Sequence, residues 1–292
     1  RWPRSRPRPS GPAGTARADR GTAPGRLLRA TAVGPSHQAG RSAERALLAT
    51  AARAFLDRER SAELAALAAR PLDWDWIQGR AEAERLAPLL YAVLRPLSPS
   101  IPILDRLRTA WVHARRQHLL GAEQLARILA AFQREGLPVI PLKGPALAET
   151  LYRDPGVRPF TDLDLLIRAA DLPGALQLLS ALGYRHLRTG PPLEFELAWR
   201  HAASFVNAEP RGDHLPVDLH WQLLDYPAGA PAAAIDHREI WGQAVEVDGW
   251  GQRRLELCPE DLLIYLALHW AVHHACSGLI WQLDLALLLR HH

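Results

Sequence analysis

Hydrophobic positions recur every three to four residues through much of the N-terminal half of the chain, which is the period of an amphipathic helix. The segments with this pattern are 42–56, 61–70, 73–97 and 103–135. The last of them is the longest, and Gly136 follows it at a position where glycine suits the end of a helix. We expect Trp74 and Trp76 to pack between these helices. The pattern predicts a helical N-terminal region over residues 42–136.

After Gly136 the hydrophobic period shortens to that of a β-strand. Strand-like runs occupy 137–142, 162–167, 184–188, 194–199, 201–207 and 215–223, and helical patterns lie between the first three at 145–152 and 171–183. This order predicts a small mixed sheet with its own helices over residues 137–257.

From Pro259 onward the pattern is helical again, and this proline is well placed in a first helical turn. The predicted fold class is therefore α+β: a small mixed β-sheet core, flanked by the N-terminal helices and by a C-terminal helical region over residues 258–292. The last helical pattern reaches the final residue, so we expect it to continue beyond residue 292. The chain has no methionine, even at position 1, and we expect a fragment or a doubtful gene start.

Residues 1–41 differ from the rest in composition. They are rich in Arg, Pro, Gly and Ala, which predicts a disordered basic leader. Nine arginines and one aspartate give this leader a net charge of +8, and the total of +4 leaves −4 for residues 42–292. A basic face on the folded part is therefore not supported, and nucleic acid is not an expected partner there. A nucleic-acid-binding arm is the weaker alternative for the leader.

Two features bear on the cellular compartment. The only cysteines are Cys258 and Cys276, too few for a disulfide framework or a closed cysteine zinc site, and we expect both to be small buried hydrophobes. The sequence contains no run of roughly 18 uncharged apolar residues and no apolar signal-peptide core. We expect no membrane partner and a cytoplasmic location.

Two aspartates interrupt the apolar run 162–167. In a strand, side chains two residues apart face the same side, so Asp162 and Asp164 should project together while Leu163 and Leu165 face the core. Two neighbouring carboxylates repel each other unless a cation lies between them. Mg2+ prefers oxygen ligands and often uses one or two carboxylates with substrate phosphates. The alternative interpretation is that both acids line the solvent face of an edge strand.

Further residues favour a phosphate-handling site. Asp218 lies in another apolar strand, and three acids on neighbouring strands would form a two-metal site for phosphoryl transfer. Lys143 and Gly144 put a cation and a permissive backbone at the end of the preceding strand. The helix that begins near Pro145 could present amide N–H groups to a phosphate, and Arg158 is a second candidate phosphate contact.

The histidines allow more than one interpretation. His269 and His273 are spaced i,i+4 on one helical face. Packing in the core or between helices is the favoured reading, and metal binding and a supporting role at the active-site cleft are the alternatives. His220 shares a strand face with Asp218, where it would contact the nucleotide or the acceptor. The alternative is a structural histidine that is hydrogen-bonded within the sheet.

The stretch "PLKGPALAETLYRDPGVRPFTDLDLLI" resembles the uncharacterised nucleotidyltransferase family, a branch of the polymerase-beta-type nucleotidyltransferase superfamily. Its members carry Lys-Gly at the first strand–helix turn, an arginine before the second strand, and an Asp-x-Asp-Leu-Leu strand. The later segments "VDLHW" and "CPEDLLIYLALHWAVHH" also resemble that family. The similarity spans roughly residues 45–292 and is strongest over 138–168.

This resemblance implies transfer of a nucleoside monophosphate from an NTP, with ATP expected, to an unknown acceptor. Mg2+ would be the cofactor, with Mn2+ as the alternative ion. Asp162, Asp164 and Asp218 would bind the metals and carry catalysis, and Asp218 would help to deprotonate the acceptor hydroxyl. The nucleotide-binding residues implied are Lys143, Gly144, Arg158, Thr161 and His220.

One departure from the superfamily concerns the first turn. Better-studied members place Gly-Ser there, whereas this chain has Lys143-Gly144-Pro145, which lacks the hydroxyl and one amide N–H. Lys143 would replace them as a point charge. The departure motivates one alternative, a catalytically weak module that senses a nucleotide or binds a protein partner. An antitoxin-like enzyme that modifies a protein partner is a further alternative. The acceptor classes left open are a sugar, an antibiotic-like molecule, a peptide product, an RNA end and a protein hydroxyl.

Overall fold

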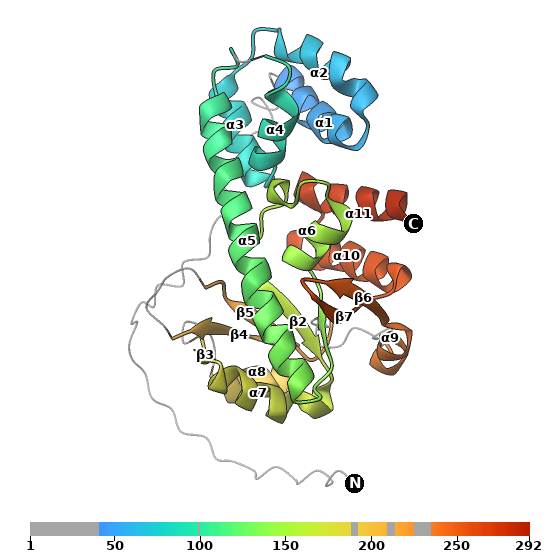
Figure 1. The fold of residues 1–292 in the computed structure, drawn as a ribbon. Coiled ribbons are helices and arrows are strands. Elements are labelled where there is room, and N and C mark those ends of the chain that lie inside the picture. The colour runs from blue at the N-terminus through green and yellow to red at the C-terminus, as the bar shows by residue number, and fades with distance from the viewer. Residues whose placement is uncertain (1–40, 99, 188–191, 209–213, 225–234) are drawn as a thin grey trace, which may run out of the picture. The chain divides into compact units, whose positions relative to one another are not determined.

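The computed structural model describes residues 41–98, 100–187, 192–208, 214–224 and 235–292 (Figure 1). Residues Arg41–His292 form one unit, and Arg1–Gly40 form another that lies outside the described residues. The disorder predicted for the basic leader therefore stays a prediction.

The N-terminal region is helical, as its hydrophobic period predicts. Its elements are α1 (Ser42–Leu56), η2 (Arg58–Arg60), α2 (Ser61–Ala68), α3 (Trp74–Ala83), α4 (Ala87–Leu94) and α5 (Leu104–Arg134). The predicted segment 73–97 is divided into α3 and α4 because Arg85 has a φ of +56°, which a helix cannot contain. Trp74 and Trp76 are partly buried against the core formed by these helices.

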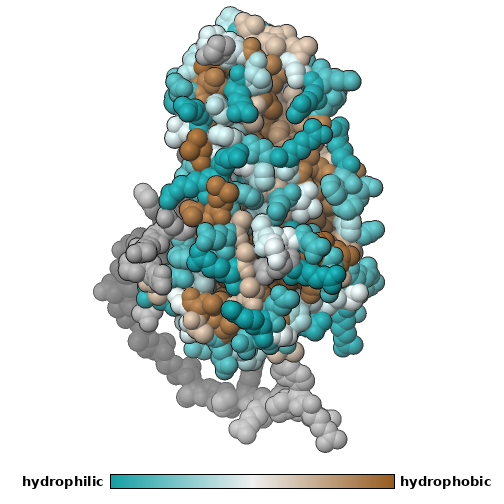
Figure 2. Space-filling model, in the orientation of Figure 1, coloured by the Kyte–Doolittle hydropathy of each residue, from teal (hydrophilic) through white to brown (hydrophobic). Residues whose placement is uncertain are grey.

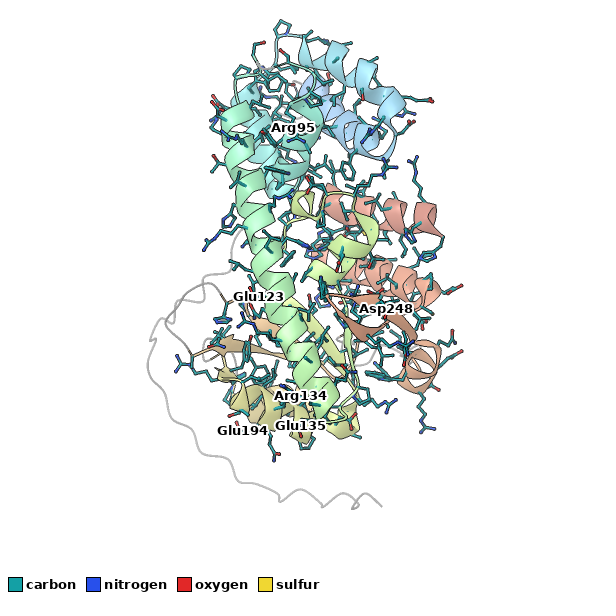
Figure 3. All side chains as sticks on the ribbon, in the orientation of Figure 1. Arg95, Glu123, Arg134, Glu135, Glu194 and Asp248 are labelled. Carbon is teal, nitrogen blue, oxygen red and sulfur yellow. The ribbon has the colours of Figure 1, made fainter. Side chains whose placement is uncertain are left out.

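Helix α5 is the longest element and ends where the sequence predicts. Gly136 adopts a φ of +66°, and the Leu137 amide N–H donates to the Phe132 carbonyl at 2.9 Å. This left-handed residue with its backward hydrogen bond is the usual glycine termination of a helix. Glu123 and Arg134 project from the outer side of α5 (Figure 3), whereas Leu125 and Phe132 are buried on its inner side.

The described residues form a mixed five-stranded sheet with the order β1-β2-β5-β4-β3. Its strands are β1 (Val139–Pro141), β2 (Leu163–Ile167), β3 (Tyr184–His186), β4 (Ala202–Asn207) and β5 (Val217–His220). Strands β2 and β5 are parallel, and the other neighbouring pairs are antiparallel. The fold is α+β, with this sheet between N-terminal and C-terminal helices.

The strand predicted over 194–199 is wrong, because this segment lies in helix α8 (Leu193–Trp199). Leu193 and Leu197 are four residues apart and both pack against the sheet core. That spacing suits one face of a helix, and a short apolar run does not separate the two periods.

Helices surround the sheet and complete the chain. The remaining helical elements are α6 (Pro145–Leu151), η3 (Pro155–Val157), η4 (Ala169–Asp171), α7 (Leu172–Ala181), α9 (His237–Gln243), α10 (Pro259–His274) and α11 (Leu279–His291). An antiparallel hairpin of β6 (Val245–Gly249) and β7 (Gln252–Glu256) was not predicted. Cys258 is buried as expected, but Cys276 is exposed, because it lies in the turn after α10 with a φ of +56°.

Two hydrophobic cores lie on the two faces of the sheet. Leu163, Leu165 and Ile167 contribute to the core shared with α5 and α7. Leu166 belongs to the other core, which is shared with α1, α4, α10 and α11. Because strand side chains alternate, Asp164 lies on the same face as Leu166, opposite the other leucines. This alternation agrees with the orientation predicted from the sequence.

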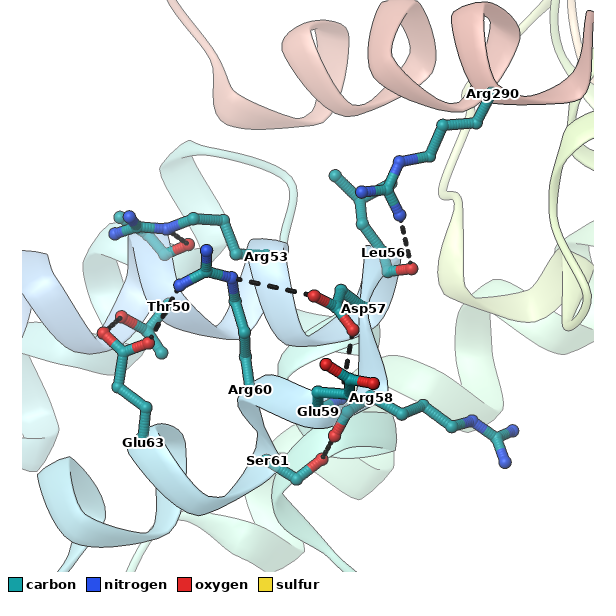
Figure 4. A network of polar contacts seen from close by, with 11 residues as sticks. Thr50, Arg53, Leu56, Asp57, Arg58, Glu59, Arg60, Ser61, Glu63 and Arg290 are labelled. Carbon is teal, nitrogen blue, oxygen red and sulfur yellow. Dashed lines mark hydrogen bonds and ion pairs between the residues drawn. The ribbon is translucent and has the colours of Figure 1, made fainter.

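Polar contacts connect α11 to the N-terminal helices (Figure 4). The Arg290 guanidinium donates to the Leu56 carbonyl at 2.7 Å, and the Asp57 carboxylate accepts from the Glu59 amide N–H at 3.1 Å at the start of η2. Hydrophilic residues dominate the visible face, with smaller hydrophobic areas between them (Figure 2). In the described part of the chain, no helix has the length and apolar character needed to cross a membrane.

Candidate active site

Three aspartates meet at adjacent parallel strands. In the β2–β5 pairing, Asp164 is the register partner of Asp218, and Asp162 immediately precedes β2. All three line a cavity of about 400 Å³, together with Thr161 and His220. We call this cavity the acid cleft. The structure thus brings together the acids that the sequence suggested would lie on neighbouring strands.

Asp164 is the most enclosed of the three acids, with 4% of its surface exposed. Its Oδ1 lies 3.0 Å from Lys143 Nζ and 3.1 Å from His220 Nε2. Its Oδ2 is also buried but has no hydrogen-bond partner among the described residues. Burial alone would raise the pKa of Asp164, but the Lys143 charge and the His220 hydrogen bond outweigh it and lower that pKa well below its usual range. Asp164 is therefore a carboxylate with one uncommitted oxygen.

The other two acids have the opposite shift. Burial and the neighbouring Asp164 charge raise the pKa of Asp162 to about 6. Burial also raises the pKa of Asp218, against a hydrogen bond from the Ser204 hydroxyl. Three carboxylates in one enclosed cleft repel one another, and a bound cation would relieve this repulsion.

Lys143 lies at the centre of a hydrogen-bonded row that crosses the cleft. Its Nζ is 3.2 Å from His269 Nε2, which is in turn 3.1 Å from His274 Nε2. Burial and the nearby Lys143 charge lower the pKa of His269 to about 2, so this histidine is neutral and accepts a hydrogen bond from Lys143. His273 stacks on His269 with ring centroids 4.9 Å apart. His269, His273 and His274 line the acid cleft. The supporting role at this cleft, one of the alternatives for His269 and His273, stays a prediction.

Arg158 does not reach the acid cleft. Its guanidinium donates through Nε and Nη2 to the two carboxylate oxygens of Asp284, both at 2.8 Å, and Asp284 also accepts from the Tyr152 hydroxyl at 2.6 Å. Arg158 is 2% exposed, and its Nε and Nη2 donors are used within the protein. The prediction that Arg158 contacts phosphate is thus at odds with its position, because its nearness in sequence to Asp162 does not carry over to the cleft.

Gly144 has a conformational role beside the cleft. It has a φ of +64°, and a Cβ atom at this position would approach the Asp162 carbonyl oxygen to 3.3 Å. Only glycine adopts such a backbone without strain. The turn therefore fits closely against the acid-bearing segment. The first residues of α6 that follow it, Pro145 and Ala146, are buried.

Several cleft residues were missed by sequence reasoning. Arg85 from the α3–α4 turn, Arg200, Ser204 from β4 and Trp281 from α11 also line the acid cleft. Ser204 is the register partner of Asp218 on the antiparallel side, so knowledge of the strand pairing would have revealed it. The other three come from distant helices or loops, and local pattern carries no signal for them.

A larger cavity of about 830 Å³ lies between α1, α4 and α11. Its two carboxylates are engaged within the protein: Asp57 accepts from the Glu59 amide N–H, and Asp154 accepts from the Trp111 indole and the Gly156 amide N–H. This cavity lacks the converging, partly unsatisfied acids that distinguish the acid cleft.

The donor atoms of the acid cleft bear on whether it can hold a metal ion. Considering the described residues, no group of three or more His, Cys, Asp or Glu side chains is arranged to hold a metal ion. The donor chemistry nevertheless fits a hard divalent cation, because the donors are carboxylates and one buried oxygen of Asp164 lacks a partner. Substrate phosphate oxygens would have to supply further ligands.

Carboxylates on neighbouring strands that share one cleft suit a metal-assisted phosphoryl-transfer site. Residues 70–292 match the family model described as uncharacterised nucleotidyltransferase, and the chain belongs to this family. No curated protein sequence matches the chain. The crystal structure of ANT(2'')-Ia in complex with adenylyl-2''-tobramycin is similar at 17% sequence identity and a TM-score of 0.40, over 58% of this chain and 88% of that one.

Proposed function

We propose that the protein transfers a nucleoside monophosphate from an NTP, ATP being the expected donor, to a hydroxyl group of an acceptor. The acceptor oxygen forms a bond to the α-phosphorus, the bond from that phosphorus to the pyrophosphate oxygen breaks, and pyrophosphate leaves with the bonding electron pair. The hydroxyl proton passes to a carboxylate. Such a reaction depends on positioning and charge neutralisation more than on covalent chemistry.

One observation carries this proposal: the parallel register that sets Asp164 beside Asp218, with one buried Asp164 oxygen unsatisfied by any described residue. Asp162, Asp164 and Asp218 are the residues that would hold Mg2+ or Mn2+. A bound divalent ion would neutralise charge on the triphosphate and on the departing pyrophosphate.

The other cleft residues have roles that follow from their contacts. Lys143 balances the Asp164 charge and orients that carboxylate. His269 hydrogen-bonds to Lys143, and His220 hydrogen-bonds to Asp164. Asp218 is the proposed acceptor of the hydroxyl proton, because a raised pKa makes a carboxylate a better base. Thr161 and His220 line the cleft where they would contact the nucleotide.

The test is transfer of label from α-labelled ATP with Mg2+ across a panel of hydroxyl acceptors. Wild type should label an acceptor, and Asp162→Asn and Asp164→Asn should each reduce labelling by about 10³-fold or more, the order expected when a main source of charge stabilisation is lost. Circular dichroism and gel filtration would establish that the variants are folded. Equal labelling by wild type and both variants would exclude the assigned acids.

A second candidate function is favoured by the Lys143–Asp164 pair. Lys143 Nζ lies 3.0 Å from Asp164 Oδ1 and neutralises that oxygen. The lysine therefore supplies a positive charge where an active enzyme would use a metal ion. The protein would then bind a nucleotide without turnover, as a sensing or partner-binding module. Calorimetric binding of ATP with no transfer to any acceptor, including candidate protein partners, would support this alternative.

A further inference from the structure

Arg85 occupies a backbone position that favours glycine. The turn after α3 closes with the Leu86 amide N–H donating to the Ala81 carbonyl at 2.7 Å, and the Arg85 amide N–H donating to the Glu82 carbonyl at 3.0 Å. This is the glycine-type helix termination, in which the left-handed residue is usually Gly. An arginine with a φ of +56° is strained there. Such strain in a cleft-lining residue suggests a functional reason for its side chain.

The α3–α4 turn is held rigidly against helix α11. The carboxylate of Glu84 accepts from the Leu279 amide N–H at 2.8 Å, at the start of α11, and it is also paired with Arg80. Arg85 follows directly, and its guanidinium lies 5.7 Å from the centre of the Trp281 ring. The His274 ring also stacks on this tryptophan, with centroids 4.3 Å apart. The turn therefore aims Arg85 at the acid cleft, which both Arg85 and Trp281 line.

Two arginines contact the Trp281 ring, but only one of them is neutralised. Arg158, also 5.7 Å from that ring, gives its donors to Asp284. Arg85 is only half-buried, and its guanidinium makes no hydrogen bond or ion pair with any residue in the described ranges. It therefore offers a planar set of donors, suited to two oxygens of one phosphate, on the side of the cleft formed by helices.

We infer that Arg85 binds the phosphates of the NTP and of the pyrophosphate product, so that the phosphate site is built jointly by the N-terminal helical region and the sheet. This inference rests on the proposed function. The arginine that contacts phosphate is then Arg85, 77 positions from Asp162 in the sequence, and not the buried Arg158. The positive charge of Arg85 complements the three aspartates that line the same cleft.

Calorimetric binding of α,β-methylene-ATP and of pyrophosphate, each with Mg2+, tests the inference. Arg85→Gln should weaken both by about 10- to 100-fold, which is the effect expected for a charge-assisted bidentate contact, while Arg85→Lys should lose less. Binding of adenosine, which has no phosphate, should change less than twofold. Arg95→Gln is the matched control, because Arg95 also lies over aromatic rings, 5.6 Å from Tyr91 and Trp111, but not in the acid cleft (Figure 3).

Arg85→Gly separates binding from folding. Glycine relieves the left-handed backbone, so the thermal midpoint should be no lower than that of wild type although phosphate binding is lost. Wild-type binding with an Arg85→Gln affinity within twofold overturns the role of Arg85 and leaves the proposed function intact. An absence of nucleotide and pyrophosphate binding by wild type overturns both.

Discussion

Two buried aspartates, each paired with a cation, behave differently in this protein. Asp284 uses both of its oxygens on Arg158 and Tyr152, and it is fully buried between helices. Asp164 pairs with Lys143 through one oxygen, and its other oxygen, at the wall of a cavity, has no hydrogen-bond partner in the part of the chain that the structure describes. We call the first, formed by Tyr152, Arg158 and Asp284, the closed centre, and the second, formed by Lys143 and Asp164, the open centre. A buried ion pair thus indicates a reactive site only when its hydrogen-bonding capacity is left partly unused.

The largest effect on stability should come from breaking the closed centre. Asp284→Ala leaves the Arg158 charge and the Tyr152 hydroxyl buried without their partner, so the free energy of unfolding should fall by about 3–5 kcal/mol. Urea titration followed by circular dichroism measures this loss. Arg290→Ala, on the exposed side of the same helix, is the control and should cost about 1 kcal/mol or less. A loss of less than about 1 kcal/mol for Asp284→Ala would contradict the assigned role.

Replacing Tyr152, Arg158 and Asp284 together tests whether the closed centre contributes to nucleotide binding or only to stability. The triple variant Tyr152→Phe/Arg158→Met/Asp284→Leu removes all the buried polar partners together, so it should recover to within about 2 kcal/mol of wild type. Affinity for α,β-methylene-ATP should stay within about threefold of wild type, since Arg158 does not line the acid cleft. A tenfold or greater loss of affinity would return Arg158 to the phosphate site.

These two centres also show what could be predicted from the sequence. The alternation in "DLDLLI" correctly predicts which side chains of β2 face the core, and the helical periods predict α1, α5 and α10 closely. The β6–β7 hairpin was missed, because its pattern of exposed charges resembles a loop. The division into a helical region and a sheet core stays a prediction, since residues 41–292 form one unit.

The residues of the candidate site were predictable where the local sequence pattern marks them, as it does for Asp218 in the apolar run 215–223. Asp162 and Asp164 are close together in the sequence, and they are conspicuous because they interrupt an apolar strand. Arg158 misled because its partner Asp284 is 126 residues away, and a pairing over such a distance leaves no mark on the local sequence. Arg85 was overlooked for a similar reason, because its turn lies far in the sequence from the acids that line the same cleft.

The open centre can be perturbed through His269, which touches Lys143 but none of the acids directly. His269→Leu removes the acceptor of the Lys143 hydrogen bond, so kcat in the label-transfer assay should fall by about tenfold, the value of one hydrogen bond to a charged group. His269→Gln keeps an acceptor and should recover most of the rate. KM for the nucleotide should change less than kcat. Equal losses with both variants would show that His269 only fills space.

The smallest expected effect concerns pH and again separates the two centres. The pKa of His269 is lowered to about 2 by burial and by Lys143, against 6.5 in the unfolded chain. The unfolded state therefore takes up a proton first as the pH falls. Stability from this histidine is fully present above pH 6.5 and is lost as the pH falls below that value, by at most about 1.4 kcal/mol per pH unit.

Urea titrations at pH 7.5 and 5.5 measure this loss as a difference between variants. Wild type should lose about 1 kcal/mol more than His269→Gln over this interval, because the variant has no proton to take up at this position. The exposed His113→Gln, on α5, is the matched control and should show the pH dependence of wild type. The triple variant at the closed centre leaves His269 and Lys143 in place, so it should retain the pH dependence of wild type. Identical pH dependence in wild type and His269→Gln would mean that His269 is not held neutral beside Lys143. The hydrogen bond from Lys143 to His269 would then not describe the open centre.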